Sequence, residues 1–210
     1  MRISWFSIFF LSACACYGQS LLLGVKGGVR ITDDITGNAT SESKRYVAGP
    51  MIELQLPLGL GVEVDALYRR EGFFASSNYV EPSSERERAN SWEFPILLKY
   101  RLAFPVVKPY IAAGYAPRMI SGGIDFNGRT CNTVTGACTS YSDHTGTNWN
   151  TSHGLVVGGG VQMGIHSLRL SPEVRYTRWG NAAINVLAHE SFQSTQNQID
   201  VLLGIAWKVH

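Results

Sequence analysis

One strand-length stretch constrains the fold more than any other. Residues 91–102 read SWEFPILLKYRL, and from Phe94 onward the even positions are apolar or aromatic. The odd positions of the same stretch include Glu93, Lys99 and Arg101. Because successive side chains of a β-strand point to opposite faces, this pattern predicts a strand with one apolar face and one mostly polar face. The next question is which of the two faces meets water.

The same alternation recurs from one end of the chain to the other. The eight segments that show it are residues 21–31, 46–58, 61–73, 91–102, 107–120, 152–165, 168–179 and 198–209. Each is about as long as a tilted strand that crosses a bilayer. The mean hydropathy of −0.01 is too polar for a bundle of membrane helices, and a net charge of +2 does not indicate a nucleic-acid partner. We therefore predict one all-β domain with eight strands.

The connections between these segments sort strictly by length. Three are short, at residues 58–60, 103–106 and 166–167, whereas the other four, at residues 32–45, 74–90, 121–151 and 180–197, are long and polar. Long and short connections alternate, so that both chain ends fall on the side of the short turns. Bacterial outer-membrane barrels have this asymmetry, with short periplasmic turns and long surface loops. The pattern favours an eight-stranded antiparallel up-and-down transmembrane β-barrel.

A soluble barrel would turn its apolar faces inward, but the composition of the polar faces favours the opposite arrangement. They combine charges of both signs, Lys26 and Arg30 included, with Gly and Ala residues that leave room for long side chains. The interior of an eight-stranded barrel is narrow and filled by side chains, and charges buried there must be paired. We therefore predict a luminal ion-pair network whose candidate members are Glu53, Glu63, Asp65, Arg69, Glu93, Lys99, Arg101, Glu173 and Arg175.

Aromatic residues gather near the ends of the predicted strands. Such positions are typical of the aromatic girdles that membrane barrels place at the two membrane–water interfaces. The candidate girdle residues are Phe73, Trp92, Phe104, Tyr115, Trp179 and Trp207.

The N-terminus has the layout of a secretory signal peptide. Arg2 is followed by an apolar run and then by small residues. We expect cleavage near Gly18, so that residues 1–18 are removed and residues 19–210 form the barrel domain. The alternative is lipidation at Cys14, because Leu-Ser-Ala-Cys at this point matches a lipoprotein box.

Two further cysteines, Cys131 and Cys138, lie close together in the longest predicted loop. An exported protein meets an oxidising compartment, so we expect them to form a local disulfide. His144 and His153 follow, but the spacing is looser than that of a zinc site, and we expect neither a metal nor a cofactor.

The stretch 91–102 resembles the E-[IF]-P-x-L-L-K-Y strand of the small outer-membrane barrels of the OmpA/OmpX type. KPYIAAGYAPR at residues 108–118 and VLLGIAWKV at residues 201–209 resemble the corresponding strands of that group. The resemblance covers essentially the whole mature chain. It implies a monomeric barrel in the outer membrane of a Gram-negative-type cell, in contact with outer-membrane lipids and lipopolysaccharide. The last strand of the group usually ends on an aromatic residue, whereas this chain ends at His210.

One stretch invites a test for catalysis. RYTRWGNAAIN at residues 175–185 is similar to the R-Y-x-H-x-S-N-A motif of the lipid A deacylase barrels. Arg178 and Gly180 stand where that motif has its catalytic His and Ser, and neither residue can act as base or nucleophile. We predict a protein that is not an enzyme and that supports the envelope or presents its long loops to an extracellular ligand. A narrow or gated channel and a lipid A-modifying enzyme are the alternatives.

Two local features leave questions open. EPSSERER at residues 81–88 clusters charges, which fits either a solvated loop or a contact with lipopolysaccharide phosphates or divalent ions. The other feature is a set of prolines inside or beside the predicted strands, where each removes a hydrogen-bond donor of the ladder. We expect local bulges at these prolines, which are Pro50, Pro95, Pro109, Pro117 and Pro172.

Overall fold

The computed structural model describes residues 19–32, 35–37, 40–77, 83–131, 135, 137–180 and 192–209. The expected signal peptide at residues 1–18 lies outside these residues. No helix in the described part of the chain is both long enough and apolar enough to cross a membrane.

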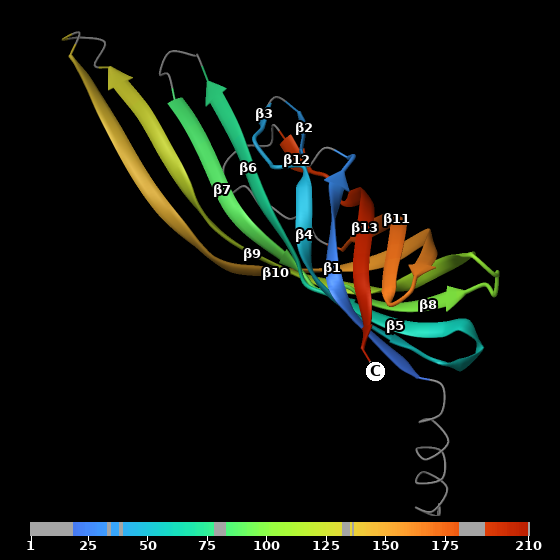
Figure 1. Ribbon diagram of the computed structural model, residues 1–210. Coiled ribbons are helices and arrows are strands. Elements are labelled where there is room, and N and C mark those ends of the chain that lie inside the picture. Colours follow the sequence, from blue (N-terminus) through green and yellow to red (C-terminus); the bar gives the residue numbers. More distant parts are fainter. Residues whose placement is uncertain are drawn as a thin grey trace, which may run out of the picture.

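Eight antiparallel strands close into a barrel (Figure 1). Two of them are interrupted once, so that β5 and β6 form one strand and β7 and β8 another. In chain order the barrel strands are β1 (Ser20–Arg30), β4 (Tyr46–Gln55), β5 (Leu60–Asp65) with β6 (Leu67–Ser77), β7 (Ser83–Glu93) with β8 (Ile96–Arg101), β9 (Val107–Cys131), β10 (Cys138–Ile165), β11 (Leu168–Trp179) and β13 (Asn197–Val209). Each strand pairs with its neighbours in this order, and β1 pairs with β13 to close the barrel. The predicted fold class is confirmed.

The remaining elements are short and lie in the connections. They are β2 (Ile35–Gly37), β3 (Thr40–Ser41), β12 (Phe192–Ser194) and the 3₁₀ turn η1 (Pro57–Gly59). At one end of the barrel the turns are tight. Gly59, the last residue of η1, has φ +80°, and an added Cβ there would lie 2.3 Å from the carbonyl oxygen of Arg101. His166 at φ 55° makes the two-residue turn between β10 and β11. The C-terminus lies at this same end (Figure 1).

The first interruption, at Ala66, lies opposite Pro50 of β4, and the second contains Pro95, but neither changes the strand register. The N–H of Ala66 donates to the oxygen of Pro50 at 3.0 Å, and Pro50 has no N–H to return the bond. In the same way Asp65 donates to the oxygen of Pro95 at 3.1 Å. The pairings Met51–Asp65 and Ala48–Tyr68, on either side of the first break, belong to one continuous register.

The other prolines also lie in regular ladders, because Pro109 pairs with Val161, Pro117 with His153 and Pro172 with Leu203 without a shift. The register shift between β9 and β10 falls at Thr147–Asn150, a segment that contains no proline. The expectation of a bulge at each proline is therefore wrong. A proline lacks an N–H and so removes one hydrogen bond from the ladder, but it does not require the extra residue that a bulge contains.

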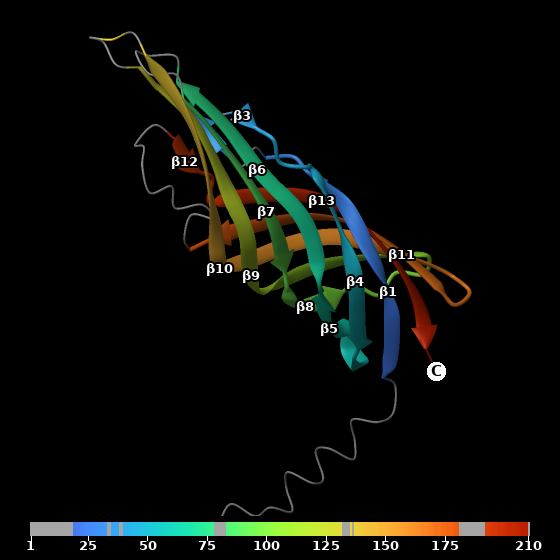
Figure 2. The same ribbon diagram turned by 90° about the vertical axis from the view of Figure 1, so that its left-hand side faces the viewer.

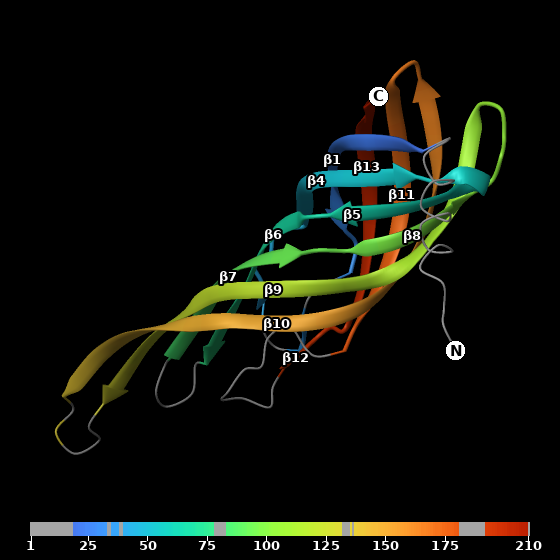
Figure 3. The same ribbon diagram turned by 90° about the horizontal axis from the view of Figure 1, so that it is seen from below.

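The segments predicted as loops at residues 74–90 and 121–151 are largely strands. The ends of β6, β7, β9 and β10 continue past the barrel as a projecting sheet of four strands (Figures 1 and 2). Seen from below, β9 and β10 extend far beyond the other strands (Figure 3). Both faces of this sheet are free to meet water, so its sequence does not need a continuous apolar face. The sequence pattern consequently gave no strand signal there.

The disulfide between Cys131 and Cys138 is confirmed. The two residues are directly opposed across β9 and β10, with Cα atoms 4.0 Å apart, at the tip of the projecting sheet. The bond ties together the two strands at the point where the chain reverses.

We expect a Cys131→Ser, Cys138→Ser double variant to keep the stability of the barrel and to lose that of the tip. The bond closes a ring of sequence separation 7 far from the barrel, so only local opening should become easier. Limited proteolysis should cut the variant near the tip faster than the parent protein. A lower unfolding midpoint of the whole barrel, followed by tryptophan fluorescence in denaturant, would contradict this reading.

Candidate functional site

The interior of the barrel is filled by charged side chains. Among the described residues, seven basic and seven acidic side chains are buried to at least nine-tenths of their area. They are Lys26, Arg30, Arg69, Lys99, Arg101, Arg118 and Arg175, and Glu53, Glu63, Asp65, Glu71, Glu93, Glu173 and Asp200. The alternation of each strand turns them inward, and the two signs balance. Burying an unpaired charge in such a site costs roughly several kcal/mol. The stability of the barrel therefore depends on how these charged side chains are paired.

Glu63 on β5 is the centre of the cluster nearer the short turns. The Nζ atoms of Lys26 and Lys99 each lie 2.5 Å from a Glu63 oxygen, and a guanidinium nitrogen of Arg175 lies at 3.3 Å. These partners come from β1, β8 and β11. One carboxylate therefore joins strands from all sides of the barrel.

Glu173 on β11 shares the same cations. It accepts from Nε of Arg175 at 2.8 Å, from Nζ of Lys26 at 3.1 Å and from the hydroxyl of Tyr110 at 2.9 Å. Arg175 also reaches Asp65 at 2.9 Å. With its two oxygens taking three donors, Glu173 is satisfied as a fully buried carboxylate must be.

Glu53 on β4 completes this cluster on the side of the short turns. It pairs with Arg101 and with Nζ of Lys99, the latter at 3.3 Å. Lys99 also lies over the ring of Tyr110, with Nζ 4.4 Å from the centroid.

A second cluster lies nearer the projecting sheet and contains more hydrogen bonds from neutral groups. Arg30 pairs with Glu93 at 3.2 Å and with Asp200 at 3.5 Å. Gln198 donates to Asp200 at 2.6 Å and accepts from the indole nitrogen of Trp179 at 2.7 Å. This cluster joins β1, β7, β11 and β13.

Arg118 on β9 links the second cluster to β6 and β10. Its guanidinium lies 3.9 Å from the ring of Trp179 and 3.9 Å from Glu71, and its Nε donates to Ser152 at 3.0 Å. Arg69 also pairs with Glu71. The interior therefore contains two layers of paired charges, with small clusters of buried apolar side chains beside them.

Glycines on the inward faces provide the room that these long side chains need. A Cβ on Gly61 would lie 3.1 Å from Arg101, one on Gly158 would lie 3.3 Å from Glu173, and one on Gly204 would lie 3.5 Å from Lys26. The contacts at Gly61 and Gly158 are tighter than ordinary packing and would require the charged groups to shift, whereas the one at Gly204 is an ordinary van der Waals contact.

All nine residues of the predicted network lie inside the barrel. The structure adds partners that the prediction did not include. These are Glu71, Tyr110, Arg118, Gln198 and Asp200. Lys26 and Arg30, which the alternation had placed among the charges of the polar faces, also take part. The alternation places Arg118 and Asp200 on polar faces as well and could have found them. Glu71 follows Arg69 at a spacing of two and carried the same signal.

The predicted girdle is divided. Trp92, Tyr115 and Trp207 are exposed on the outer surface, and Phe104 is exposed in the turn between β8 and β9. Nothing is described for the side chain of Phe73.

For Trp179 the prediction is wrong, because its indole is 1% exposed and lies inside the barrel. It shares the inward positions of β11 with Glu173 and Arg175, and the period of two turns it inward with them.

The outer surface of the barrel is apolar. Leu98, Ile111 and Leu155 have exposed fractions of 57%, 68% and 68%, and similar residues surround them on every strand. The even positions of the stretch 91–102 therefore point outward, and Glu93, Lys99 and Arg101 point inward, as the alternation predicted.

The stretch that resembles a deacylase motif is described only as far as Gly180, since residues 181–185 lie outside the described residues. Arg178 and Gly180 are exposed at the end of β11. Within the described ranges, no group of three or more His, Cys, Asp or Glu side chains could hold a metal ion.

No protein-family model and no curated protein matches the sequence. Solved structures do match. The outer membrane protein OprG from Pseudomonas aeruginosa matches with a TM-score of 0.54 at 11% identity, over 92% of this chain and 96% of that one. Neisserial surface protein A matches with a TM-score of 0.46 at 16% identity, over 91% and 99%. A major outer membrane protein from Thermus thermophilus matches with a TM-score of 0.47 at 11% identity, over 92% and 100%.

The likeness to OprG shows the class: the chain has the fold of a small bacterial outer-membrane β-barrel protein. More particularly, it is an eight-stranded antiparallel barrel, the fold that the resemblance to the OmpA/OmpX type implied.

Removing the central carboxylate should be the most damaging single change in the interior. A Glu63→Gln variant leaves Lys26, Lys99 and Arg175 with too few buried anions, and we expect a loss of about 3–5 kcal/mol in the free energy of unfolding. Denaturant titration of the folded protein in lipid vesicles measures it. Adding Lys99→Met to the variant should restore part of the loss, because it removes one of the stranded cations.

The matched control is Glu42→Gln. Its ion pair with Arg86 has side chains 35% and 41% exposed, so its loss should cost at most about 1 kcal/mol. Equal losses in the two variants would contradict a stabilising role for the interior network.

Proposed function

We propose that the chain is an integral outer-membrane protein without catalytic activity, whose barrel carries the projecting sheet at the cell surface for contact with an extracellular partner. The observation that carries the proposal is the inversion of polarity, with paired charges inside the barrel and apolar side chains exposed outside it. In water such a surface would be an extensive apolar patch, whereas in a bilayer it is the expected one.

The orientation follows from the two ends of the barrel. The short turns and the C-terminus lie at one end, and the projecting sheet lies at the other (Figure 1). Short periplasmic turns and longer extracellular segments are the rule in outer-membrane barrels. The disulfide at the tip of the sheet is consistent with an oxidising, extracytoplasmic location.

A wide channel is disfavoured by the interior. The side chains of Glu63, Lys99 and Glu173 are completely buried and meet one another across the lumen. Ion passage would require these pairs to separate. We therefore place an envelope or surface-interaction role ahead of conduction.

The barrel should resist SDS until it is heated. Closed ladders leave no free edge within the barrel, so the unboiled protein should migrate differently from the boiled protein in electrophoresis. The measurement uses the isolated outer-membrane fraction. Recovery of the protein in the soluble periplasm, with no heat-dependent shift, would exclude the proposal.

A Leu98→Arg variant tests directly whether the apolar face meets lipid. Leu98 on β8 lies about midway along the chain between two exposed aromatic residues, Trp92 on β7 and Phe104 in the turn after β8. Arginine near the bilayer midplane should lower the free energy of unfolding by about 2–4 kcal/mol in vesicles.

The control is Tyr141→Arg on the projecting sheet, because Tyr141 is 52% exposed, close to the 57% of Leu98. In water this change should stay within about 0.5 kcal/mol. If Leu98→Arg is as mild as Tyr141→Arg, the outer face does not meet lipid.

A further inference from the structure

The outer face of β6 and β7 changes character in steps toward the projecting sheet. From Phe94, just after β7, the outward positions run back along β7 through Trp92 and Asn90 to Arg88. On β6, Tyr68 is followed by Arg70. The rings of Tyr68 and Trp92 are 5.2 Å apart, and the Tyr68 hydroxyl donates to Asn90 at 2.8 Å. An aromatic level is therefore followed directly by a cationic one.

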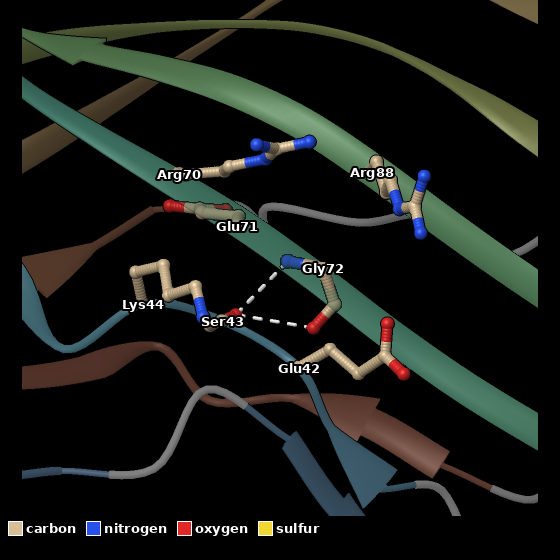
Figure 4. Close-up of a pocket in the computed structure, with 7 residues that line it drawn as sticks. All are labelled: Glu42, Ser43, Lys44, Arg70, Glu71, Gly72 and Arg88. Carbon is tan, nitrogen blue, oxygen red and sulfur yellow. Dashed lines mark hydrogen bonds between the residues drawn. The ribbon is translucent and has the colours of Figure 1, made fainter.

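The cationic level borders a cavity of about 640 Å³ that is open to the outside (Figure 4). Arg70 and Arg88 lie on one side of Gly72, and the segment Glu42–Lys44 lies on the other. That segment is fixed to β6 by hydrogen bonds. The backbone N–H of Lys44 donates to the carbonyl oxygen of Arg70 at 2.9 Å. The Ser43 hydroxyl donates to the carbonyl oxygen of Gly72 and accepts from its N–H.

Gly72 lies in the lining of the cavity and has no side chain to fill it. It is the residue directly opposite Arg88 in the ladder, and Arg70 is opposite Asn90. Diagonal neighbours on one face of a sheet are about 7–8 Å apart, within reach of long side chains. Because Gly72 has no side chain, Arg70 and Arg88 can both extend over the same open space.

The charges around the cavity are not balanced. Lys44, Arg70 and Arg88 are exposed, and none of them has an ion pair in the part of the chain that is described. The two acids of the lining already have partners, since Glu42 pairs with Arg86 at 2.9 Å and Glu71 pairs with Arg69 inside the barrel. Three cations thus share one cavity without a counter-ion from the described protein.

We propose that this cavity binds the phosphate groups of a lipid headgroup in the outer leaflet, of which the lipid A phosphates of lipopolysaccharide are the chemical example. Two guanidinium groups and an ammonium group are the donors that phosphate oxygens accept best. The proposal rests on the proposed function, because it requires the aromatic level of Tyr68 and Trp92 to lie at the membrane interface.

The height of the cavity relative to the membrane interface favours a lipid over a soluble anion as its ligand. Arg70 is two residues beyond Tyr68 along β6, which is about 7 Å at the rise of a strand. A headgroup phosphate lies just outside the interfacial aromatics. The acyl chains below it would contact the apolar outer face of the barrel, so one ligand would meet both surfaces.

The experiment compares the full mature protein with an Arg70→Gln, Arg88→Gln double variant in phosphatidylcholine nanodiscs that contain a small fraction of bisphosphorylated lipid A. Native mass spectrometry counts the lipid A molecules that stay bound. We expect the affinity for lipid A to be at least about tenfold lower in the double variant than in the parent protein. Raised salt should also weaken the binding of lipid A to the parent protein.

Arg178→Gln is the matched control. Arg178 is also an exposed arginine, near the end of β11, and its contact is with Asn197 at 3.5 Å rather than with the cavity. This variant should bind lipid A like the parent. A second arm uses dephosphorylated lipid A, which should bind the parent protein as weakly as bisphosphorylated lipid A binds the double variant.

Each other outcome overturns the inference in a recognisable way. Unchanged binding in the double variant excludes the cavity, and equal retention of dephosphorylated lipid A excludes phosphate recognition. If millimolar inorganic phosphate displaced all of the bound lipid A, the cavity would be a site for a soluble anion. A parent protein that shows no heat-dependent shift and does not enter nanodiscs refutes the proposed function, and the lipid site with it.

Discussion

The fold depends on the pairing of charges inside a narrow barrel. Lys26 and Glu173 are 147 positions apart in sequence, yet their side chains meet at 3.1 Å with Glu63 beside them. Such contacts require the correct register of every strand between them. A slip of one residue would turn a strand's charges onto the apolar surface and its apolar residues into the lumen. The network thus specifies one register as well as stabilising it.

The same constraint explains why the barrel itself offers little chemistry. Its interior carboxylates are occupied by cations and its outer surface is apolar, so neither can vary freely. Variation is tolerated where the strands leave the membrane-facing part of the barrel. There β6, β7, β9 and β10 continue as a sheet with two open faces, and the outer face of β6 and β7 becomes cationic.

The sequence predicted those features that follow from a period of two. Strand number, the inward direction of the nine network residues and the disulfide all come from alternation, spacing or compartment. It could not predict which charges meet, because the stagger of the closed barrel decides that Glu63 contacts Lys26 and Lys99 rather than other cations. Trp179 was wrongly assigned to the girdle because it is an aromatic residue at the end of a strand. Its spacing of an even number of residues from Glu173 and Arg175 already placed it on the inward face. The projecting sheet was missed because a strand with two wet faces has no alternation to detect.

The balance of charge inside the barrel also determines what an approaching anion meets. Seven cations and seven carboxylates cancel in the lumen of the described chain, so its buried groups contribute no net charge to the field outside. Fields from exposed charges are screened over about 8–10 Å in physiological salt. The three cations around Gly72 therefore act on whatever lies against β6 and β7 at that height, and hardly on solutes at a distance. A headgroup held there by the bilayer is continuously within this range, whereas a soluble anion is there only in passing.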